Sequence, residues 1–171
     1  MSKARNDQFL TDWSASDGLE VLSFELDGER FALEATLVRE ILDLLPETAV
    51  PGAPGIVNSV INFRGRVIPL ADLRVAFNME VATATIDSRI VVIEIPVLDE
   101  PTLVGLRTDK VHEVTSLNYA DSEPAPSVGI RWRPDYIRRL VKREGDFIIL
   151  PDLQAIFASQ AAVGASPSLH S

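Results

Sequence analysis

The sequence reads Val67-Ile-Pro-Leu-Ala-Asp-Leu-Arg-Val-Ala-Phe77 and, 80 residues later, Phe147-Ile-Ile-Leu-Pro-Asp-Leu-Gln-Ala-Ile-Phe157. The identical pairs in this alignment are Ile68/Ile148, Leu70/Leu150, Asp72/Asp152, Leu73/Leu153 and Phe77/Phe157. The alignment continues upstream without a gap, so that Gly65 meets Gly145 and Ile61 meets Val141. This repeat predicts the same turn, strand and capped helix in each half of the chain.

Chance is the alternative explanation, since hairpins followed by capped helices are common. Duplication is favoured because the turn glycine and the cap aspartate of both copies stay in register. With an insertion allowed, Val38-Arg-Glu-Ile41 also resembles Val111-His-Glu-Val114. A half of about 80 residues that is rich in short strands has the size of a small antiparallel barrel. We therefore expect two small barrels that pack together.

The remaining elements follow from hydrophobic periodicity and turn residues. Predicted hairpins span residues 22–33, 60–70 and 136–150, and further strands cover 89–95, 102–107 and 109–114. Short helices are predicted to begin at Asp72 and Asp152. The apolar residues of the segment Thr36 to Leu45 recur at helical spacing, which predicts a helix of about three turns there.

Composition and charge limit the possible partners and compartments. The 171 residues carry a formal net charge of −9, which argues against binding to nucleic acid or to an anionic membrane face. The sequence lacks cysteine, a signal peptide and an apolar segment long enough to span a membrane, so we expect a cytoplasmic protein. Residues 1–18 and 159–171 are predicted to be flexible tails around a domain at 19–158.

Candidate catalytic residues are scarce. His170 falls in the predicted C-terminal tail, and His112 lies in an extended run where a solvated surface position is expected. Motifs for a nucleophilic serine, a phosphate loop or a dinucleotide site are missing, and neither cysteines nor a histidine pair could hold a metal. We expect no cofactor and no enzymatic activity.

The order and spacing of several segments resemble the CheW family of chemotaxis adaptor proteins. They are Phe24-x-Leu-Asp-Gly-Glu-Arg-Phe-Ala-Leu33, Val38-Arg-Glu-Ile41, Pro51-Gly-Ala-Pro54, Val60-Ile-Asn-Phe-Arg-Gly65, Val67-Ile-Pro-Leu-Ala-Asp-Leu73, Ile90-Val-Val-Ile93, Asp109-x-Val-x-Glu-Val114 and Phe147-Ile-Ile-Leu-Pro-Asp-Leu153. The resemblance implies a mainly β fold of two interlocked, SH3-like five-stranded β-barrels around a shared core, with a few short helices. It also implies a bridge between the cytoplasmic tip of methyl-accepting chemoreceptors and the regulatory domain of a CheA-type histidine kinase.

The resemblance also implies site residues. Glu40 and Arg64 match positions that are functionally important in the family, and Val38 and Ile41 are candidate apolar contacts for a receptor helix or, equally, core residues. From the residues alone, Glu40 and Arg64 are either separate surface groups or a polar pair at the edge of an apolar groove. Ser59 and Arg139 replace glycines that are usual in the family, which bears on interface detail and partner choice.

Other functions remain open at this point. Related adaptors serve sister pathways such as pilus motility or gene regulation. A small β-barrel protein that binds a small ligand is a second alternative, and it would need convergent polar groups in a pocket. A fragment of a larger kinase or a phosphorylatable hybrid is not favoured, because neither an acidic response-regulator cluster nor a histidine-phosphotransfer helix is present.

Overall fold

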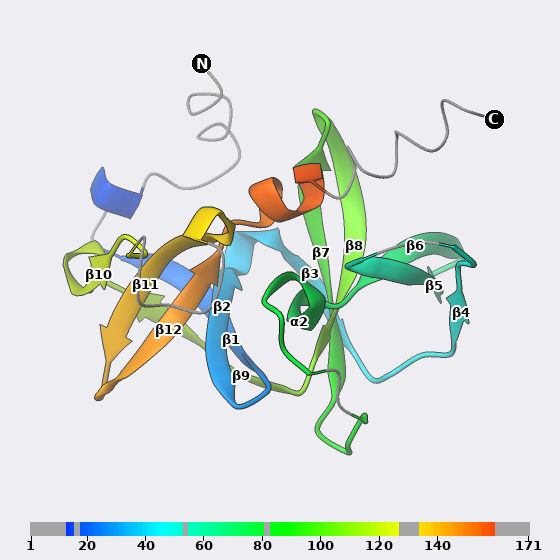
Figure 1. Cartoon of the computed structure of the whole chain (residues 1–171), viewed down its shortest axis with the longest axis horizontal. Coiled ribbons are helices and arrows are strands. Elements are labelled where there is room, and N and C mark those ends of the chain that lie inside the picture. The colour runs from blue at the N-terminus through cyan, green and yellow to red at the C-terminus, as the bar shows by residue number, and fades with distance from the viewer. Residues whose placement is uncertain (1–12, 16–17, 53–54, 81–82, 127–133, 160–171) are drawn as a thin grey trace.

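The fold is a mainly β structure in which two lobes lie side by side (Figure 1). The computed structural model describes residues 13–15, 18–52, 55–80, 83–126 and 134–159. Within these residues, none of the helices has the length and apolar character needed to cross a membrane.

Two six-stranded sheets form the two lobes. The strands are β1 (Leu19–Leu26), β2 (Glu29–Glu34), β3 (Val38–Leu42), β4 (Glu47–Ala49), β5 (Val57–Phe63), β6 (Arg66–Ala71), β7 (Arg89–Val97), β8 (Glu100–Thr108), β9 (Lys110–Leu117), β10 (Ser122–Glu123), β11 (Ile137–Arg143) and β12 (Asp146–Pro151). Sheet A has the order β10-β11-β12-β2-β1-β9, and sheet B has the order β4-β5-β6-β8-β7-β3.

Short helical elements connect these strands. They are the 3-10 turns η1 (Trp13–Ala15), η2 (Ala35–Leu37), η3 (Tyr119–Asp121) and η4 (Pro134–Tyr136), the helix α2 (Leu73–Ala76), and a helix at residues 153–159. The predicted helices after Asp72 and Asp152 are thus confirmed.

The two halves of the chain exchange their first hairpins. The hairpin β1–β2 joins sheet A, whose other strands are β9 to β12, whereas β7–β8 joins sheet B, whose other strands are β3 to β6. The exchanged hairpins are attached through parallel pairings, β12 with β2 and β6 with β8. Neither lobe is therefore built from one continuous half of the chain, which is the interlocked arrangement that the resemblance implied.

Atomic details confirm the repeat. The turns of β5–β6 and β11–β12 both have two residues with positive φ, Arg64-Gly65 at 53° and 81° and Glu144-Gly145 at 50° and 83°. Asp72 accepts from the backbone N–H of Arg74, and Asp152 accepts from that of Ala155, so both aspartates cap helices. Because these contacts recur at one offset, the two halves are versions of the same structural unit.

Three hydrophobic clusters hold the fold together. One lies inside sheet A and includes Trp13 and Ile148, and another lies inside sheet B and includes Ile61 and Ile68. The largest cluster combines side chains of both sheets with those of the two capped helices, and Phe77 lies within it. Central strands are consequently buried on both faces, which explains runs such as Ile90 to Ile93.

Three expectations need correction. The segment from Thr36 to Leu45 contains η2 and strand β3 in place of a helix. The sheets have six described strands each, and their hydrogen-bonded ladders do not close into barrels in the part of the chain described. Trp13 belongs to the folded domain: it is 2% exposed and its Nε1 donates to the carbonyl oxygen of Leu117 at 2.8 Å. The other residues of the predicted tails lie largely outside the described ranges.

Candidate functional site

The hairpin tip between β5 and β6 presents Arg64 to solvent. Arg64 and Gly65 both have positive φ, the geometry of a type I′ turn that matches the twist of the flanking strands. The side-chain oxygen of Asn62 accepts from the N–H of Gly65 at 2.9 Å and fixes the turn. The motif Asn-x-Arg-Gly is therefore a turn that holds one arginine at its tip, where the side chain is 70% exposed.

Glu40 and Arg64 form an ion pair across the open side of sheet B. A guanidinium N–H of Arg64 donates to Oε1 of Glu40. Glu40 lies on edge strand β3, and β7, β8 and β6 separate that strand from β5 in the sheet. The pair can form only because sheet B curls, so it bridges a gap that backbone hydrogen bonds leave open. Glu40 and Arg64 therefore do form a polar pair, although Glu40 lies on a strand and not on a helix. A role of this pair in binding a protein stays a prediction.

A β-bulge places Val38 and Ile41 on one face of β3. Val38 pairs with Ile93 and Glu40 with Val92, so Arg39 is an extra residue in the ladder. Without the bulge, residues three apart would lie on opposite faces of a strand. Val38 is half-buried against the shared core, whereas Ile41 is 43% exposed. The apolar face of the shared core thus continues into solvent at Ile41.

A small groove adjoins this face. It has a volume of about 210 Å³, and its lining residues are Thr36, Leu37, Arg39, Glu94, Ile95, Pro96 and Pro101. Arg39 and Glu94 at its rim are 3.4 Å apart as an exposed ion pair. The edge of sheet B therefore combines an apolar groove with two ion pairs, an arrangement suited to orienting a docked protein.

Ser59 and Arg139 occupy equivalent positions of the repeat, 80 residues apart, each directly after a bulged residue of β5 or β11. The hydroxyl of Ser59 lies 3.3 Å from a carboxylate oxygen of Glu47 on β4. Arg139 donates from Nε to the hydroxyl of Ser122 on β10 at 2.6 Å and stacks over the ring of Tyr119. Both replacements thus attach a short edge strand through a side chain, which glycine cannot do.

Arg74 links the two sheets from a buried position. Its Nε donates to Asp72 at 3.0 Å and its Nη1 to Asp109 at 2.8 Å, while Asp109 also accepts from the backbone N–H of Asp27 in the β1–β2 turn. Burial opposes the charge on Arg74, but its hydrogen bond to Asp72 and the charges of three aspartates outweigh burial and raise its pKa. The exchanged hairpin is thereby tied to α2 of the other sheet.

Several contacts were not predicted from the sequence. Arg107 on β8 pairs with Glu47. His112 on β9 is half-buried and pairs with Glu25 on β1, so the predicted solvated surface position of His112 was wrong. The pair His112–Glu25 in sheet A corresponds to Arg39–Glu94 in sheet B. Aligning the whole repeat would have indicated these equivalences, since Val111-His-Glu-Val114 already matched Val38-Arg-Glu-Ile41.

Comparison with known proteins agrees with this architecture. The CheW-like domain matches residues 20–161, and the chain belongs to this family of non-catalytic chemotaxis scaffolds.

Curated relatives and a solved structure cover most of the chain. The chemotaxis protein CheW of Rhizobium meliloti (strain 1021) is 30% identical over 143 residues, which are 84% of this chain and 90% of that protein. The chemotaxis protein CheW of Bacillus subtilis (strain 168) is 28% identical over 151 residues, which are 88% of this chain and 94% of that protein. The crystal structure of the scaffolding protein TtCheW from Thermoanaerobacter tengcongensis has a TM-score of 0.73 at 28% identity, with 82% of this chain and 88% of that one covered.

Proposed function

We propose that the protein couples methyl-accepting chemoreceptors to the regulatory domain of a CheA-type histidine kinase, in the cytoplasm at the inner face of the membrane. The observation that carries the proposal is the edge strand β3, which holds the ion pair of Glu40 and Arg64 on one face and presents Val38 and Ile41 on the other. Membership of the CheW-like family supports the kind of partner.

The two parts of this surface suit different tasks. Val38, Ile41 and the adjoining groove can accept apolar side chains of a receptor helix. The charged groups of Glu40 and Arg64 set orientation, because a misaligned partner would leave them facing like charges or apolar atoms. Control of the kinase then comes from differential binding to its conformational states, and the adaptor performs no chemistry of its own.

Ser59 and Arg139 bear on the choice among related partners. The resemblance implies glycine at both positions in the family, and both side chains attach an edge strand that lies beside an exposed surface. A kinase or receptor of a sister pathway, controlling pilus motility or gene expression, is therefore the alternative partner. Binding measured against each kinase paralogue of the same cell decides between the two.

Calorimetric titration of the full chain with the kinase regulatory domain and, separately, with a receptor-tip fragment tests the proposal. We expect saturable binding at micromolar affinity or tighter, about −8 kcal/mol, to at least one partner. Arg64→Glu should weaken that binding at least tenfold, or about 1.4 kcal/mol, because it places two carboxylates side by side.

Lys142→Glu is the matched control, since it reverses a charge at an exposed position of sheet A. Unchanged affinity of Arg64→Glu for both partners, or equal losses in the two variants, would refute the role of the Glu40–Arg64 pair.

A further inference from the structure

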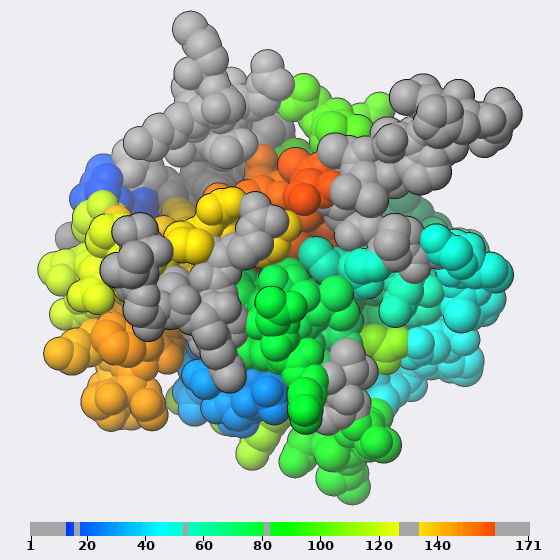
Figure 2. Space-filling view, viewed as in Figure 1, coloured from blue at the N-terminus to red at the C-terminus, as the bar shows by residue number. Residues whose placement is uncertain are grey.

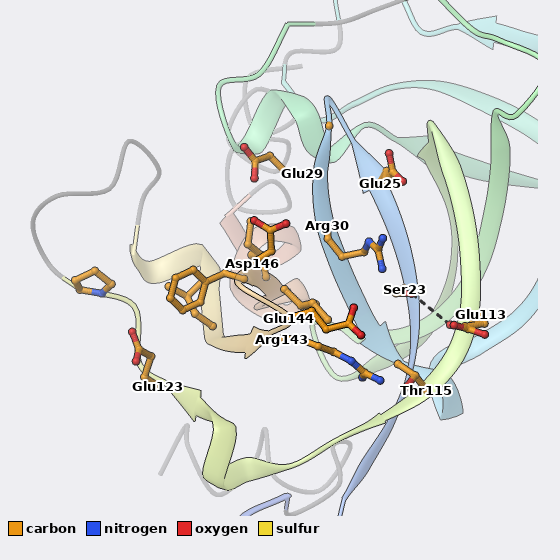
Figure 3. Close-up of a pocket in the computed structure, with 16 residues that line it drawn as sticks. Ser23, Glu25, Glu29, Arg30, Glu113, Thr115, Glu123, Arg143, Glu144 and Asp146 are labelled. Atoms are coloured by element: carbon orange, nitrogen blue, oxygen red, sulfur yellow. Dashed lines mark hydrogen bonds between the residues drawn. The ribbon is translucent and has the colours of Figure 1, made fainter.

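A cavity of about 640 Å³ opens at the tip of the β11–β12 hairpin in sheet A. Figure 3 shows Arg143 and Glu144 extending from this tip toward strand β9, which carries Glu113 and Thr115. The tip and the β1–β2 turn lie at the lower left of the molecule in Figure 2, in orange and blue. The cavity therefore lies at an exposed end of sheet A, on the other sheet from Glu40 and Arg64.

The repeat explains why this end stays open. Glu113 on β9 is the equivalent of Glu40, and Glu144 in the β11–β12 turn is the equivalent of Arg64. In sheet B the opposite charges of this pair attract and bridge the gap. In sheet A both equivalents are carboxylates, so these two positions cannot form the ion pair of sheet B. The neighbouring Arg143 instead donates to the carbonyl oxygen of Ser116 on β9 at 3.5 Å.

The charges at the cavity are unbalanced. Six carboxylates and two guanidinium groups give the lining a formal net charge of −4: Glu25, Glu29, Glu113, Glu123, Glu144 and Asp146 against Arg30 and Arg143. The carboxylates surround the cavity instead of converging, and among the described residues no group of three or more acidic or histidine side chains is placed to hold a metal ion. A basic organic group has the charge and size that this space accepts.

Apolar side chains form the rest of the wall. Leu140, Phe147, Ile148 and Ile149 line the cavity, and Phe147 is 43% exposed at its mouth. An exposed aromatic ring next to carboxylates binds a guanidinium or ammonium group through both its face and the neighbouring charges. The volume also lies within the range that holds a few side chains of a ligand, about 300–1,000 Å³.

We propose that this acidic cavity is a separate docking site for a protein segment that presents arginine or lysine beside an apolar side chain. The basic group lies between Glu113 and Glu144 and supplies the positive charge that Arg64 supplies in sheet B. The apolar neighbour packs on Phe147. The site lies in sheet A, on the opposite lobe from Glu40 and Arg64.

Nuclear magnetic resonance of the full 15N-labelled chain tests the site, with the peptide acetyl-Gly-Leu-Arg-Leu-Arg-Gly-amide as the probe. We expect saturable shifts confined to the amides of residues 113–115 and 143–148. Glu144→Arg should reduce the affinity at least tenfold, because it restores the charge pattern of sheet B and pairs with Glu113. The backbone tolerates arginine there, since Arg64 has nearly the same φ in the equivalent turn.

Three comparisons decide the outcome. Glu100→Arg makes the same charge change at an exposed turn of β7–β8, and it should leave the affinity unchanged. Phe147→Thr removes an exposed aromatic ring and should weaken binding of the peptide. Equal losses in Glu144→Arg and Glu100→Arg, equal affinity for spermidine, or shifts spread over the whole acidic surface would each overturn the proposal.

Discussion

Arg74 places a positive charge between the two sheets, where its side chain is 6% exposed beside Asp72 at 7%. Removing one partner of a buried ion pair leaves the other charge without compensation, at a cost of about 3–5 kcal/mol. We expect Arg74→Ala to lower the free energy of unfolding by about 3 kcal/mol in urea titrations. Arg89→Ala removes a partly exposed arginine that pairs with Asp43 and donates to the carbonyl oxygens of Ile86 and Ser88, and it should lower the free energy of unfolding by only about 1 kcal/mol. Similar values for the two variants would contradict a structural role for the buried network.

Arg139 shows how one residue can secure an edge strand. Its guanidinium lies 4.4 Å from the ring centre of Tyr119 and donates to Ser122. We expect Arg139→Gly to lower the free energy of unfolding by about 1–2 kcal/mol, since it removes a cation–π contact and hydrogen bonds. Amide exchange of residues 122–123 should accelerate more than that of β5, where the equivalent Ser59 is unchanged. Uniform acceleration over both sheets would count against this explanation.

At the scale of elements, the repeat predicted more of the structure than periodicity did. Turn glycines and cap aspartates depend on local geometry, so both hairpin turns and both capped helices could be predicted from residues 65–77 and 145–157. The predicted helix at 36–45 was wrong for a physical reason. A bulge at Arg39 puts Val38 and Ile41 on one face, which imitates helical spacing, and the pairing with β7 depends on residues far away in the sequence.

Strand β3 also separates core residues from contact residues. Val38 packs against the shared core, so Val38→Ala should lower the free energy of unfolding by about 1–2 kcal/mol. Ile41→Ala changes an exposed side chain, so it should alter the free energy of unfolding by no more than about 0.5 kcal/mol. The same variant should weaken binding to the receptor. Thermal melts and titrations of both variants check this division. A loss of stability in Ile41→Ala with intact receptor binding would assign Ile41 to the core.

On the scale of the whole molecule, exchanged hairpins and a shared core predict that both lobes unfold together. Ile68 and Ile148 are equivalent in the repeat and lie in the separate clusters of sheets B and A. Ile68→Val and Ile148→Val should each destabilise one common transition by about 0.5–1.5 kcal/mol. Calorimetry with fluorescence of the buried Trp13 checks this. Two transitions, each sensitive to one variant, would show independent lobes.

The interlocked lobes and the family could be predicted from the sequence, because ordered motifs cover nearly the whole chain. The candidate site could be predicted only in part. Glu40 and Arg64 were identified, but their contact depends on the curl of sheet B, which no local pattern encodes. The acidic cavity was missed for the same reason: Glu113 and Glu144 line one cavity only because β9 and the β11–β12 turn lie at one end of sheet A.

The most direct test of coupling is whether one copy of the chain holds both partners at once. Sedimentation velocity of the full chain with the kinase regulatory domain and a receptor-tip fragment measures this. The coupling proposal predicts a ternary complex that is heavier than either binary complex and is weakened by Arg64→Glu. Binding of one partner that displaces the other, or binding of neither, would contradict the central claim that the protein couples receptor to kinase.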